Sequence, residues 1–282
     1  MVSIQQLEFG YKKAINLFSD LDLQLIPGNI YGLLGKNGAG KTTLLKIIGG
    51  LLYSHHGFVK VYEADPRQRT PAMLRDLYFI PEDLISPAMK GSTFISIYKS
   101  FYPKFDPLLM NELLAEFDIS ETEDLHKMSF GQRKKFFIAF GLATNTRLLI
   151  LDEPTNGLDI PSKSLFRKMI ASQMTENRIV IVSTHQVRDL QSLIDPVIVL
   201  DNGKIVFNES IEIIQDKLLF ENFNALDDSI DFLYSETTAF GVQTIQLRKD
   251  QRPSKVDLEL LFNALVAGTP RIYQLFNPAT YE

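Results

Sequence analysis

The 282-residue sequence contains no cysteine, which excludes both a disulfide framework and a metal site built from thiolates. It also has no apolar stretch approaching the roughly 18–20 residues that a membrane-spanning helix requires. The first residues lack a basic segment followed by an apolar one, so no signal peptide is evident. We therefore expect a soluble chain that reaches a membrane only through a partner.

The sequence also lacks an excess of positive charge. Its net charge is −5, and the acidic excess lies in residues 211–282, which hold 6 Lys and Arg against 11 Asp and Glu. Residues 1–210 hold 23 of each and are neutral. A basic surface is therefore not expected as the main feature, and we predict no nucleic-acid partner.

The most informative segment runs from Gly35 to Thr42 and fits the phosphate-loop pattern G-x-x-x-x-G-K-[ST]. An apolar segment suited to a buried strand, Ile30–Leu34, precedes it, and the helix-like Leu44–Ile48 follows. Glycines let the backbone curl so that successive N–H groups point at one anion, and a helix N-terminus adds positive potential. The sequence thus predicts a nucleoside triphosphate site, with the candidate binding residues Gly35, Lys36, Asn37, Gly38, Ala39, Gly40, Lys41, Thr42 and Thr43.

A second nucleotide motif is the apolar run Leu148–Leu151, which ends in Asp152 and Glu153. Ligands of open α/β sheets bind at the carboxyl ends of the strands, so these carboxylates are expected beside the phosphate loop. There Lys41 would reach the β- and γ-phosphates, and Thr42 and Asp152 would help to hold Mg²⁺. One residue further, Glu153 can polarise a water for attack on the γ-phosphate.

The remaining patterns indicate an α/β organisation with a helical insertion near residues 85–145. Continuous apolar runs such as Leu148–Leu151 and Ile179–Val182 suit strands of a parallel sheet covered on both faces. Period-two or apolar patterns predict further strands, and three-and-four spacing predicts helices within the insertion. The predicted strands are Ser3–Phe9, Leu21–Leu25 and Gly57–Tyr62; the helical positions are Phe94, Ile97, Tyr98, Phe101, Leu109, Leu113 and Phe117, followed by a helix from Gly131 to about Thr144.

The motifs end near Ser210, so we assign residues 1–210 to a nucleotide-binding domain. Residues 211–282 contain a strand-like piece, Val242–Leu247, and a helix-like piece, Val256–Leu265. We expect a small acidic C-terminal extension, and its sequence reveals no role.

Together these motifs resemble the ATP-binding-cassette (ABC) family. The family's signature Leu-Ser-Gly-Gly-Gln has a counterpart in Met128–Gln132, and its turn after the catalytic glutamate has one in Pro154–Asp159. His185, directly after a predicted strand, corresponds to the family's switch histidine. Tyr11 is the best candidate for the aromatic side chain that stacks on adenine. The resemblance implies catalytic roles for Glu153 and His185.

The resemblance implies a P-loop nucleotide-binding fold with an antiparallel β subdomain, a helical insertion and a small C-terminal extension. It also implies that two such domains pack head to tail and hold ATP between them. Ser129 and the backbone N–H groups of Gly131 and Gln132 would then form a second anion site at a helix start.

Two residues depart from the family pattern. Phe130 replaces the middle glycine of the signature, and we expect its ring to pack against the partner or the helical insertion. Glu82 stands where the family usually has a glutamine that touches Mg²⁺ and the attacking water. A carboxylate can still ligate the metal, but it adds negative charge beside the phosphates. We therefore expect an effect on the rate of hydrolysis more than on nucleotide binding.

The resulting hypothesis is an ATP-binding, ATP-hydrolysing subunit of an ABC exporter, a homodimer or half of a heterodimer. It would dock on a separate transmembrane permease at the cytoplasmic face of the membrane. The segment Phe101–Asp106 also resembles bacterial exporter subunits, including some linked to peptide-antibiotic resistance. Two alternatives stay open: a soluble family member acting on ribosomes or DNA, and a regulatory half with poor hydrolysis. Intact Glu153 and His185 argue against the regulatory half, whereas Glu82 and Phe130 argue mildly for it.

Overall fold

The computed structural model describes residues 1–12, 15–225, 230–249 and 254–276. The parts of the expected C-terminal extension at 226–229, 250–253 and 277–282 lie outside the described residues. Among the helices that are described, none combines the length and apolar character that crossing a lipid bilayer demands.

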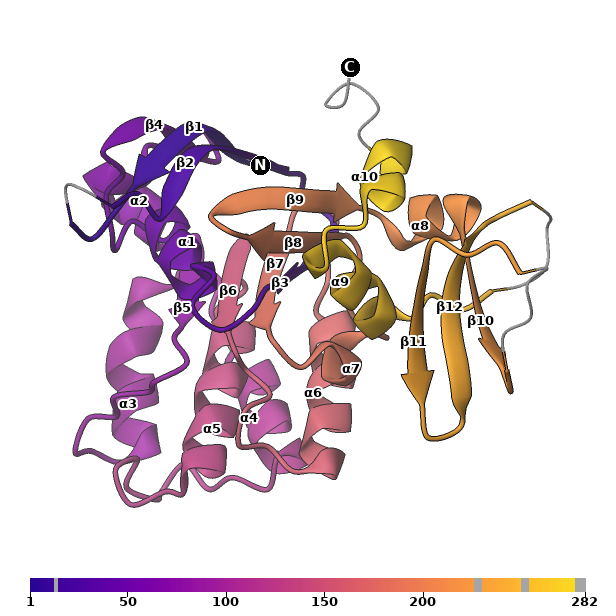
Figure 1. Cartoon of the computed structure of the whole chain (residues 1–282). Helices are drawn as coiled ribbons and strands as arrows, with labels where there is room; N and C mark the ends of the chain where they lie inside the picture. Colours follow the sequence, from indigo (N-terminus) through magenta and orange to yellow (C-terminus); the bar gives the residue numbers. More distant parts are fainter. Residues whose placement is uncertain (13–14, 226–229, 250–253, 277–282) are drawn as a thin grey trace.

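The centre of the molecule is a sheet with the strand order β5-β6-β7-β3-β8-β9 (Figure 1). Its strands pair in parallel from β5 to β8, and β9 pairs antiparallel with β8 at the edge. The predicted α/β fold is thus confirmed. The strands are β3 (Asn29–Leu34), β5 (Leu77–Ile80), β6 (Leu148–Asp152), β7 (Ile179–Thr184), β8 (Val197–Asp201) and β9 (Lys204–Glu209).

Both faces of the central sheet are buried, which explains the continuous apolar runs. In β6, Leu148 and Ile150 join one hydrophobic cluster, whereas Leu149 and Leu151 join another on the opposite face. Strand side chains alternate between the two faces, so a strand covered on both sides must be apolar at every position. Helices α5 (Phe130–Ala143) and α6 (Ile160–Ser172) contribute to the second cluster.

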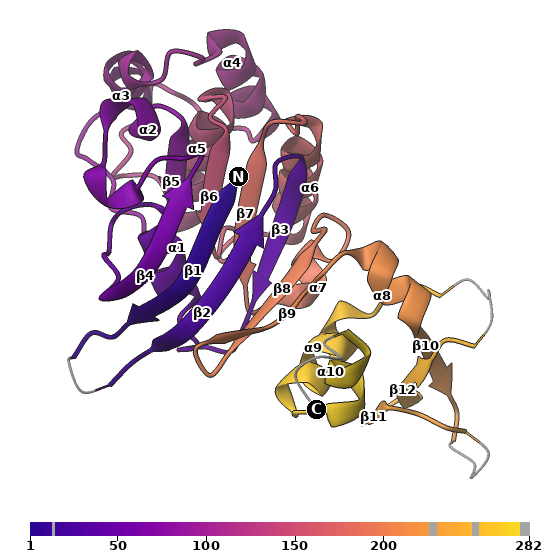
Figure 2. The ribbon, with the colours of Figure 1, turned by 90° about the horizontal axis from the view of Figure 1, so that it is seen from above.

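A second, antiparallel sheet with the order β2-β1-β4 accounts for the predicted β subdomain. It packs over the central sheet together with helix α1, because all three contribute to one hydrophobic cluster (Figure 2). The elements of this region are β1 (Val2–Phe9), β2 (Phe18–Leu25), β4 (His56–Val61), α1 (Lys41–Ile48), the short 3-10 helix η1 (Pro66–Gln68) and α2 (Pro71–Leu74).

The predicted helical insertion consists of α3 (Gly91–Tyr98), the 3-10 turn η2 (Lys99–Phe101), α4 (Pro107–Glu116) and α5. Its core is aromatic: the buried Phe94 ring makes edge contacts with the rings of Phe136, Phe137 and Phe140. Of the other predicted stripe residues, Phe117 is also buried, whereas Ile97, Tyr98 and Phe101 are exposed, Phe101 at 58%. The insertion therefore has both a packed interior and an apolar outer surface.

The C-terminal region forms a three-stranded antiparallel sheet with the order β10-β12-β11 beside three helices. Its buried residues belong to the same hydrophobic cluster as Leu149, Leu151 and helices α5 and α6. The rings of Phe207 and Phe276 meet edge to face. The region lies to one side of the central sheet (Figure 2). The elements are α8 (Ile211–Lys217), β10 (Leu218–Phe223), β11 (Tyr234–Thr238), β12 (Gly241–Leu247), α9 (Leu258–Val266) and α10 (Pro270–Phe276); a short helix of the main body, α7 (Val187–Leu190), contacts α9.

Candidate nucleotide site

The loop between β3 and α1 has the geometry that the sequence pattern predicts. Gly40 caps α1 with φ of +106°, a conformation that favours glycine. A side chain there would also meet the ring of Phe18, which lies 2.8 Å from the ideal Cβ position. The loop thus requires glycine at this point, and it delivers Lys41 and Thr42 to the first turn of the helix.

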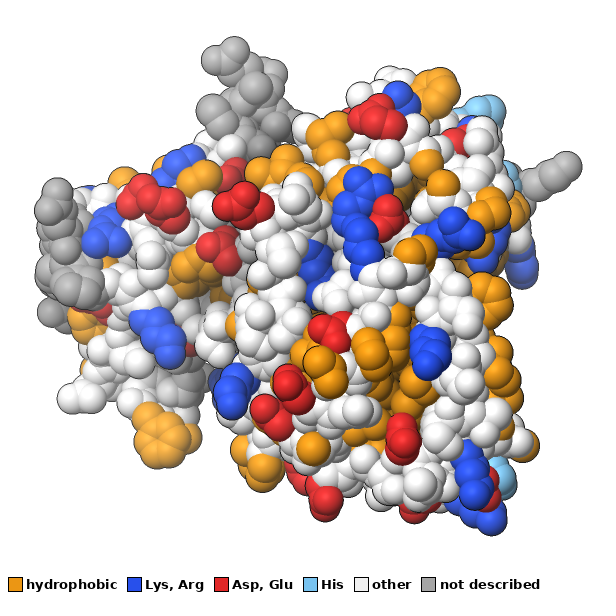
Figure 3. Space-filling model, turned by 180° about the vertical axis from the view of Figure 1, so that it is seen from behind, with side chains coloured by type: hydrophobic (Ala, Val, Ile, Leu, Met, Phe, Trp, Pro, Cys, Tyr) orange, Lys and Arg blue, Asp and Glu red, His pale blue; other side chains and the backbone are white. Residues whose placement is uncertain are grey.

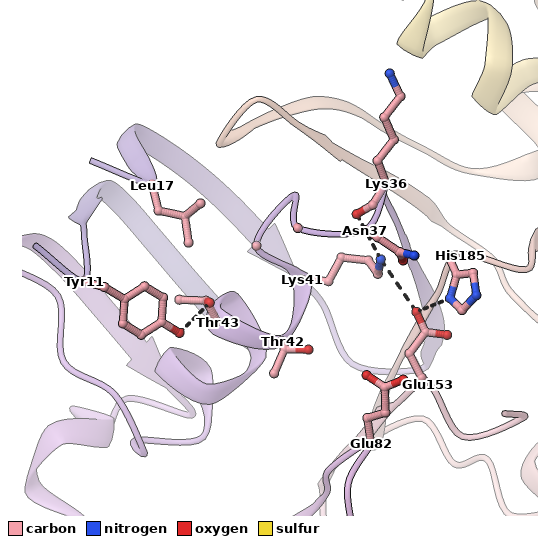
Figure 4. Close-up of a pocket in the computed structure, with 12 residues that line it drawn as sticks. Tyr11, Leu17, Lys36, Asn37, Lys41, Thr42, Thr43, Glu82, Glu153 and His185 are labelled. Atoms are coloured by element: carbon pink, nitrogen blue, oxygen red, sulfur yellow. Dashed lines mark hydrogen bonds and ion pairs between the residues drawn. The ribbon is translucent and has the colours of Figure 1, made fainter. Parts of the chain in front are cut away.

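The loop opens onto a cavity of about 620 Å³ (Figure 4). Most predicted site residues line it, and they come from five separate parts of the chain. The lining residues are Tyr11, Leu17, Lys36, Asn37, Gly38, Gly40, Lys41, Thr42, Thr43, Glu82, Glu153 and His185. Sequence reasoning missed Leu17, which precedes β2 and carries no motif that could have revealed it.

Lys41 lies at the centre of the site and is 7% exposed. Its Nζ donates to the carbonyl oxygen of Gly35 at 2.7 Å and lies 3.6 Å from Glu153 Oε1. The ammonium is therefore held by the phosphate loop itself and by a carboxylate from β6. It occupies the position from which it can contact an anion in the loop.

Asp152 is completely buried at the end of β6 and accepts two hydroxyl hydrogen bonds. Thr42 Oγ1 donates to Oδ2 at 2.7 Å, and Ser183 Oγ donates to Oδ1 at 2.5 Å. The partner on β7 follows from the sheet register, in which Asp152 pairs directly with Ser183. The predicted proximity of Thr42 and Asp152 is thus present. The role of Ser183 was missed, although a hydroxyl at the end of a neighbouring parallel strand is a usable signal.

Glu153 follows Asp152 and turns its side chain into the cavity (Figure 4). Its φ of +46° is uncommon for a residue other than glycine, and such backbone strain clusters at functional sites. Oε1 lies 2.9 Å from His185 Nδ1, whereas the buried Oε2 has no hydrogen-bond partner among the described residues. A buried carboxylate oxygen without a donor is suited to a water molecule or a cation.

Two further lining residues interact with their surroundings in specific ways. The Tyr11 hydroxyl points toward Thr43 and lies 2.9 Å from its Oγ1 (Figure 4), although the residue is 67% exposed. Glu82 Oε1 accepts a hydrogen bond of 3.1 Å from Asn156 Nδ2. The carboxylate that departs from the family pattern is therefore attached to the turn that follows Glu153.

The predicted signature residues do not line this cavity. Ser129 is exposed and caps α5: its Oγ accepts from the Gln132 N–H at 3.2 Å, and Gln132 Oε1 accepts from the Ser129 N–H. The Gln132 N–H expected to meet a phosphate thus already has a partner. Gly131 lies in the same turn, where an added Cβ would approach the Gly157 carbonyl oxygen.

Comparison with known proteins identifies the family. A sequence profile described as "ABC transporter" matches residues 18–156. An uncharacterized ABC transporter ATP-binding protein from Methanocaldococcus jannaschii is 31% identical over 216 residues, covering 75% of this chain and 78% of the relative. The chain belongs to the ABC transporter ATP-binding family.

Other comparisons agree with this membership. The lantibiotic transport ATP-binding protein SrtF of Streptococcus pyogenes is 29% identical, covering 78% of this chain and 99% of that protein. A dimeric ATP-binding cassette in a post-hydrolysis state, bound to ADP and Pi, matches the fold with a TM-score of 0.66 at 21% identity. That structure covers 75% of this chain, and this chain covers 99% of it.

As an ABC transporter ATP-binding subunit, the chain binds ATP, is an ATPase and powers a separate permease. Members of this family pair with a transmembrane permease and dimerise. The relatives named above are transport proteins, which favours a transporter subunit over a soluble family member acting on ribosomes or DNA. The regulatory half with poor hydrolysis stays a prediction.

One of the two departures from the ABC family pattern, Phe130, makes a contact within its own chain that was not predicted. The Phe130 ring lies against Gly157 of its own chain, at 2.6 Å from the ideal Cβ position of that glycine. Gly157 has φ of +78°, so only glycine fits both the backbone and the ring. The contact therefore joins the signature of this ABC subunit to the turn after Glu153.

Proposed function

We propose that this chain uses Glu153 as the base for ATP hydrolysis and that hydrolysis alternates with head-to-tail dimerisation of two such subunits. The observation that carries the proposal is the position of Glu153: its Oε1 lies between Lys41 and His185, and its buried Oε2 has no hydrogen-bond partner among the described residues. Such a group can orient a water molecule and accept its proton. His185 would hold the carboxylate and contact the γ-phosphate from the other side.

The phosphates would bind to the backbone N–H groups of residues 35–43 and to Lys41. On binding, the Lys41 ammonium would exchange the Gly35 carbonyl oxygen for a phosphate oxygen. Tyr11 at the cavity mouth would stack on the adenine ring. All of these contacts come from one subunit, so a single chain would bind ATP before it dimerises.

We further propose that ATP is bound with Mg²⁺. No group of three or more His, Cys, Asp or Glu side chains in the described residues is arranged to hold a metal alone. Magnesium in nucleotide sites commonly uses one or two carboxylates together with phosphate oxygens, and the oxygen donors of Thr42, Asp152 and Glu82 fit that chemistry. The ion would neutralise charge on the phosphates during transfer.

The second anion site would be the signature of a partner subunit. Ser129 Oγ and the N–H of Gly131 lie at the start of the 14-residue helix α5, where the helix dipole favours a negative group. Because these groups lie outside the cavity of their own chain, they would serve the cavity of the other. The dimer would use either a second copy of this chain or a related subunit.

Glu153→Gln tests the hydrolytic proposal. The variant should lose turnover while retaining ATP, because the amide cannot accept a proton, and gel filtration with ATP and Mg²⁺ should then show a dimer. Glu116→Gln is a matched control, since Glu116 is exposed on α4 far from the cavity, and it should keep full turnover. Normal turnover in Glu153→Gln would refute the assignment of the base.

The permease would dock on an apolar groove of about 740 Å³ between α2, β5 and α3. Hydrophobic side chains gather on the side of the molecule where α3 lies, as seen from behind (Figure 3). Tyr98, Phe101 and Tyr102 line the groove together with two cations, Arg69 and Arg75. We propose that it receives a cytoplasmic helix of the permease with apolar and acidic side chains, which would place the subunit at the cytoplasmic face of the membrane.

Export is the proposed direction of transport. It is supported by the similarity to a lantibiotic transport protein and by the exporter-like segment Phe101–Asp106, which borders the groove. The substitution Phe101→Asp should move the chain from the membrane fraction of its native cells to the soluble fraction. The ATPase activity of the purified chain should be unchanged; unaltered membrane recovery would exclude this docking site.

A further inference from the structure

Lys134 is a fully buried cation that no part of the proposed mechanism uses. It lies on α5, one turn after the signature, and its side chain has no measurable exposure. Its Nζ donates to two backbone carbonyl oxygens, that of Glu153 at 2.6 Å and that of Asn156 at 3.2 Å. Burying a charge is costly unless its hydrogen bonds are satisfied. The two carbonyl oxygens therefore fix the ammonium, and the ammonium fixes the turn from Glu153 to Asn156.

A second contact fastens the same two segments. The Lys134 ammonium lies 4.9 Å from the centroid of the Phe130 ring, and that ring packs on Gly157. Helix α5, which carries the signature, therefore contacts both ends of the turn 153–157 of its own chain. This turn carries Glu153, whose left-handed backbone needs support from its surroundings.

Lys134 is also placed to balance charge. Burial lowers the pKa of Lys134, and the carboxylates of Glu82 and Glu153 act in the opposite direction. Glu82 is attached to the same turn through Asn156, whose side chain donates to Glu82 while its carbonyl oxygen accepts from Lys134. In a site of low dielectric constant a nearby cation has a large effect on such a carboxylate.

We propose that Lys134 is a positioning residue for ATP hydrolysis: it holds the Glu153–Asn156 turn so that the Glu153 carboxylate faces the cavity, and its charge offsets the carboxylate of Glu82. The inference rests on the proposed role of Glu153. It adds an internal link between the signature, which serves the partner's nucleotide, and the base that serves the chain's own nucleotide.

The first test is Lys134→Met, which keeps the length of the side chain and removes its charge and donors. We expect kcat for ATP to fall by about tenfold or more, while KM and the Kd of a fluorescent ATP analogue change by less than about threefold. Lys134 contacts the turn and not the phosphate loop, so binding should survive. Lys135→Met removes the neighbouring charge of the same helix and should retain kcat within about twofold.

The second test separates charge from packing. Glu82→Gln removes the negative charge that Lys134 is proposed to offset. We therefore compare its effect on kcat in two backgrounds: the change in kcat should be more favourable in Lys134→Met than in the wild type, by about threefold or more. Lys134→Gln keeps hydrogen-bond donors without charge, and it carries the same measurement if Lys134→Met does not fold. A purely structural lysine would give no such coupling to Glu82.

The outcomes are distinct. Unchanged kcat in Lys134→Met, an equal loss in Lys135→Met, or a joint loss of binding and turnover without coupling to Glu82 would overturn the inference. Glu153→Gln is measured in parallel. If that variant turns over normally, the proposed base is wrong, whereas an inactive Glu153→Gln beside a normal Lys134→Met refutes the positioning role alone.

Discussion

The two halves of the proposed nucleotide site differ in how far a single chain completes them. The phosphate-loop half, which we call the enclosed half, is assembled within one chain, because the loop after β3 and the residues after β6 and β7 meet at one edge of the parallel sheet. The signature half is open, because Ser129 lies outside that cavity at an exposed helix start and caps its own helix. A parallel sheet can gather residues from distant parts of one chain. A surface helix terminus offers its groups to a second molecule.

The strongest way to break the enclosed half is to remove its cation. Lys41→Ala should lower ATP turnover by about 100-fold or more, which corresponds to roughly 2.7 kcal/mol of lost stabilisation. The reason is that Lys41 is buried in the phosphate loop, where its Nζ donates to the Gly35 carbonyl oxygen, whereas Lys36 of the same loop is exposed. Steady-state phosphate release and equilibrium binding of a fluorescent ATP analogue measure the effect.

A lysine on the same helix provides the control. Lys46 lies at the last turn of α1, away from the cavity, and Lys46→Ala should keep turnover and nucleotide affinity close to those of the wild type. If Lys41→Ala binds and hydrolyses ATP normally, the assignment of the phosphate loop fails.

The function of the signature half can be removed without changing ATP binding by the phosphate-loop half. Ser129→Asp keeps a good N-cap for α5 but adds a negative charge where a partner's phosphate would lie. We expect about a tenfold loss of turnover with unchanged ATP binding by the single chain, because like charges across an interface are repelled. Turnover measured against protein concentration, together with nucleotide titration at low concentration, separates the two effects.

Ser210→Asp makes the same change at another cap, since Ser210 caps α8 with its own hydroxyl. It should affect neither measurement. Equal loss of ATP binding in Ser129→Asp at low protein concentration would show that the signature serves its own chain, which would remove the contrast between the halves.

The proximity of the phosphate loop to Asp152 and Glu153 could be predicted because short stretches of sequence encode it, and the roles of these residues stay predictions. The glycine pattern of the loop and the continuous apolar run at 148–151 each reflect a local requirement, a tight turn in one case and burial on both faces in the other. The placement of Asp152 beside Thr42 then follows from the parallel sheet. The short strand Leu77–Ile80 and the helix Ile160–Ser172 were not predicted, because their patterns are brief or weakly periodic.

Relations between distant segments could not be read from the sequence. Nothing in the run Gln-Arg-Lys-Lys indicates that Lys134 is buried against carbonyl groups of a turn some twenty residues away. The Phe130 ring was expected to meet a partner or the helical insertion, and only the fold brings Gly157 to it. In the C-terminal region the strand Val242–Leu247 was predicted, but its pairing with β10 and β11 depends on long-range contacts.

The smallest expected effect sharpens the comparison at the mouth of the enclosed half. Tyr11 offers a ring for adenine and a hydroxyl that bonds to Thr43, and two substitutions separate these roles. Tyr11→Ala should weaken ATP binding by about fivefold, because stacking of one base on an aromatic ring is worth about 1–3 kcal/mol and an exposed ring lies at the low end of that range. Tyr11→Phe keeps the ring and should bind within about twofold of the wild type, since Thr43 is already held by the loop helix. If both variants lost affinity equally, the hydroxyl rather than the ring would be responsible for the affinity. Tyr11 would then support ATP binding through its hydrogen bond to Thr43 and not by stacking on adenine.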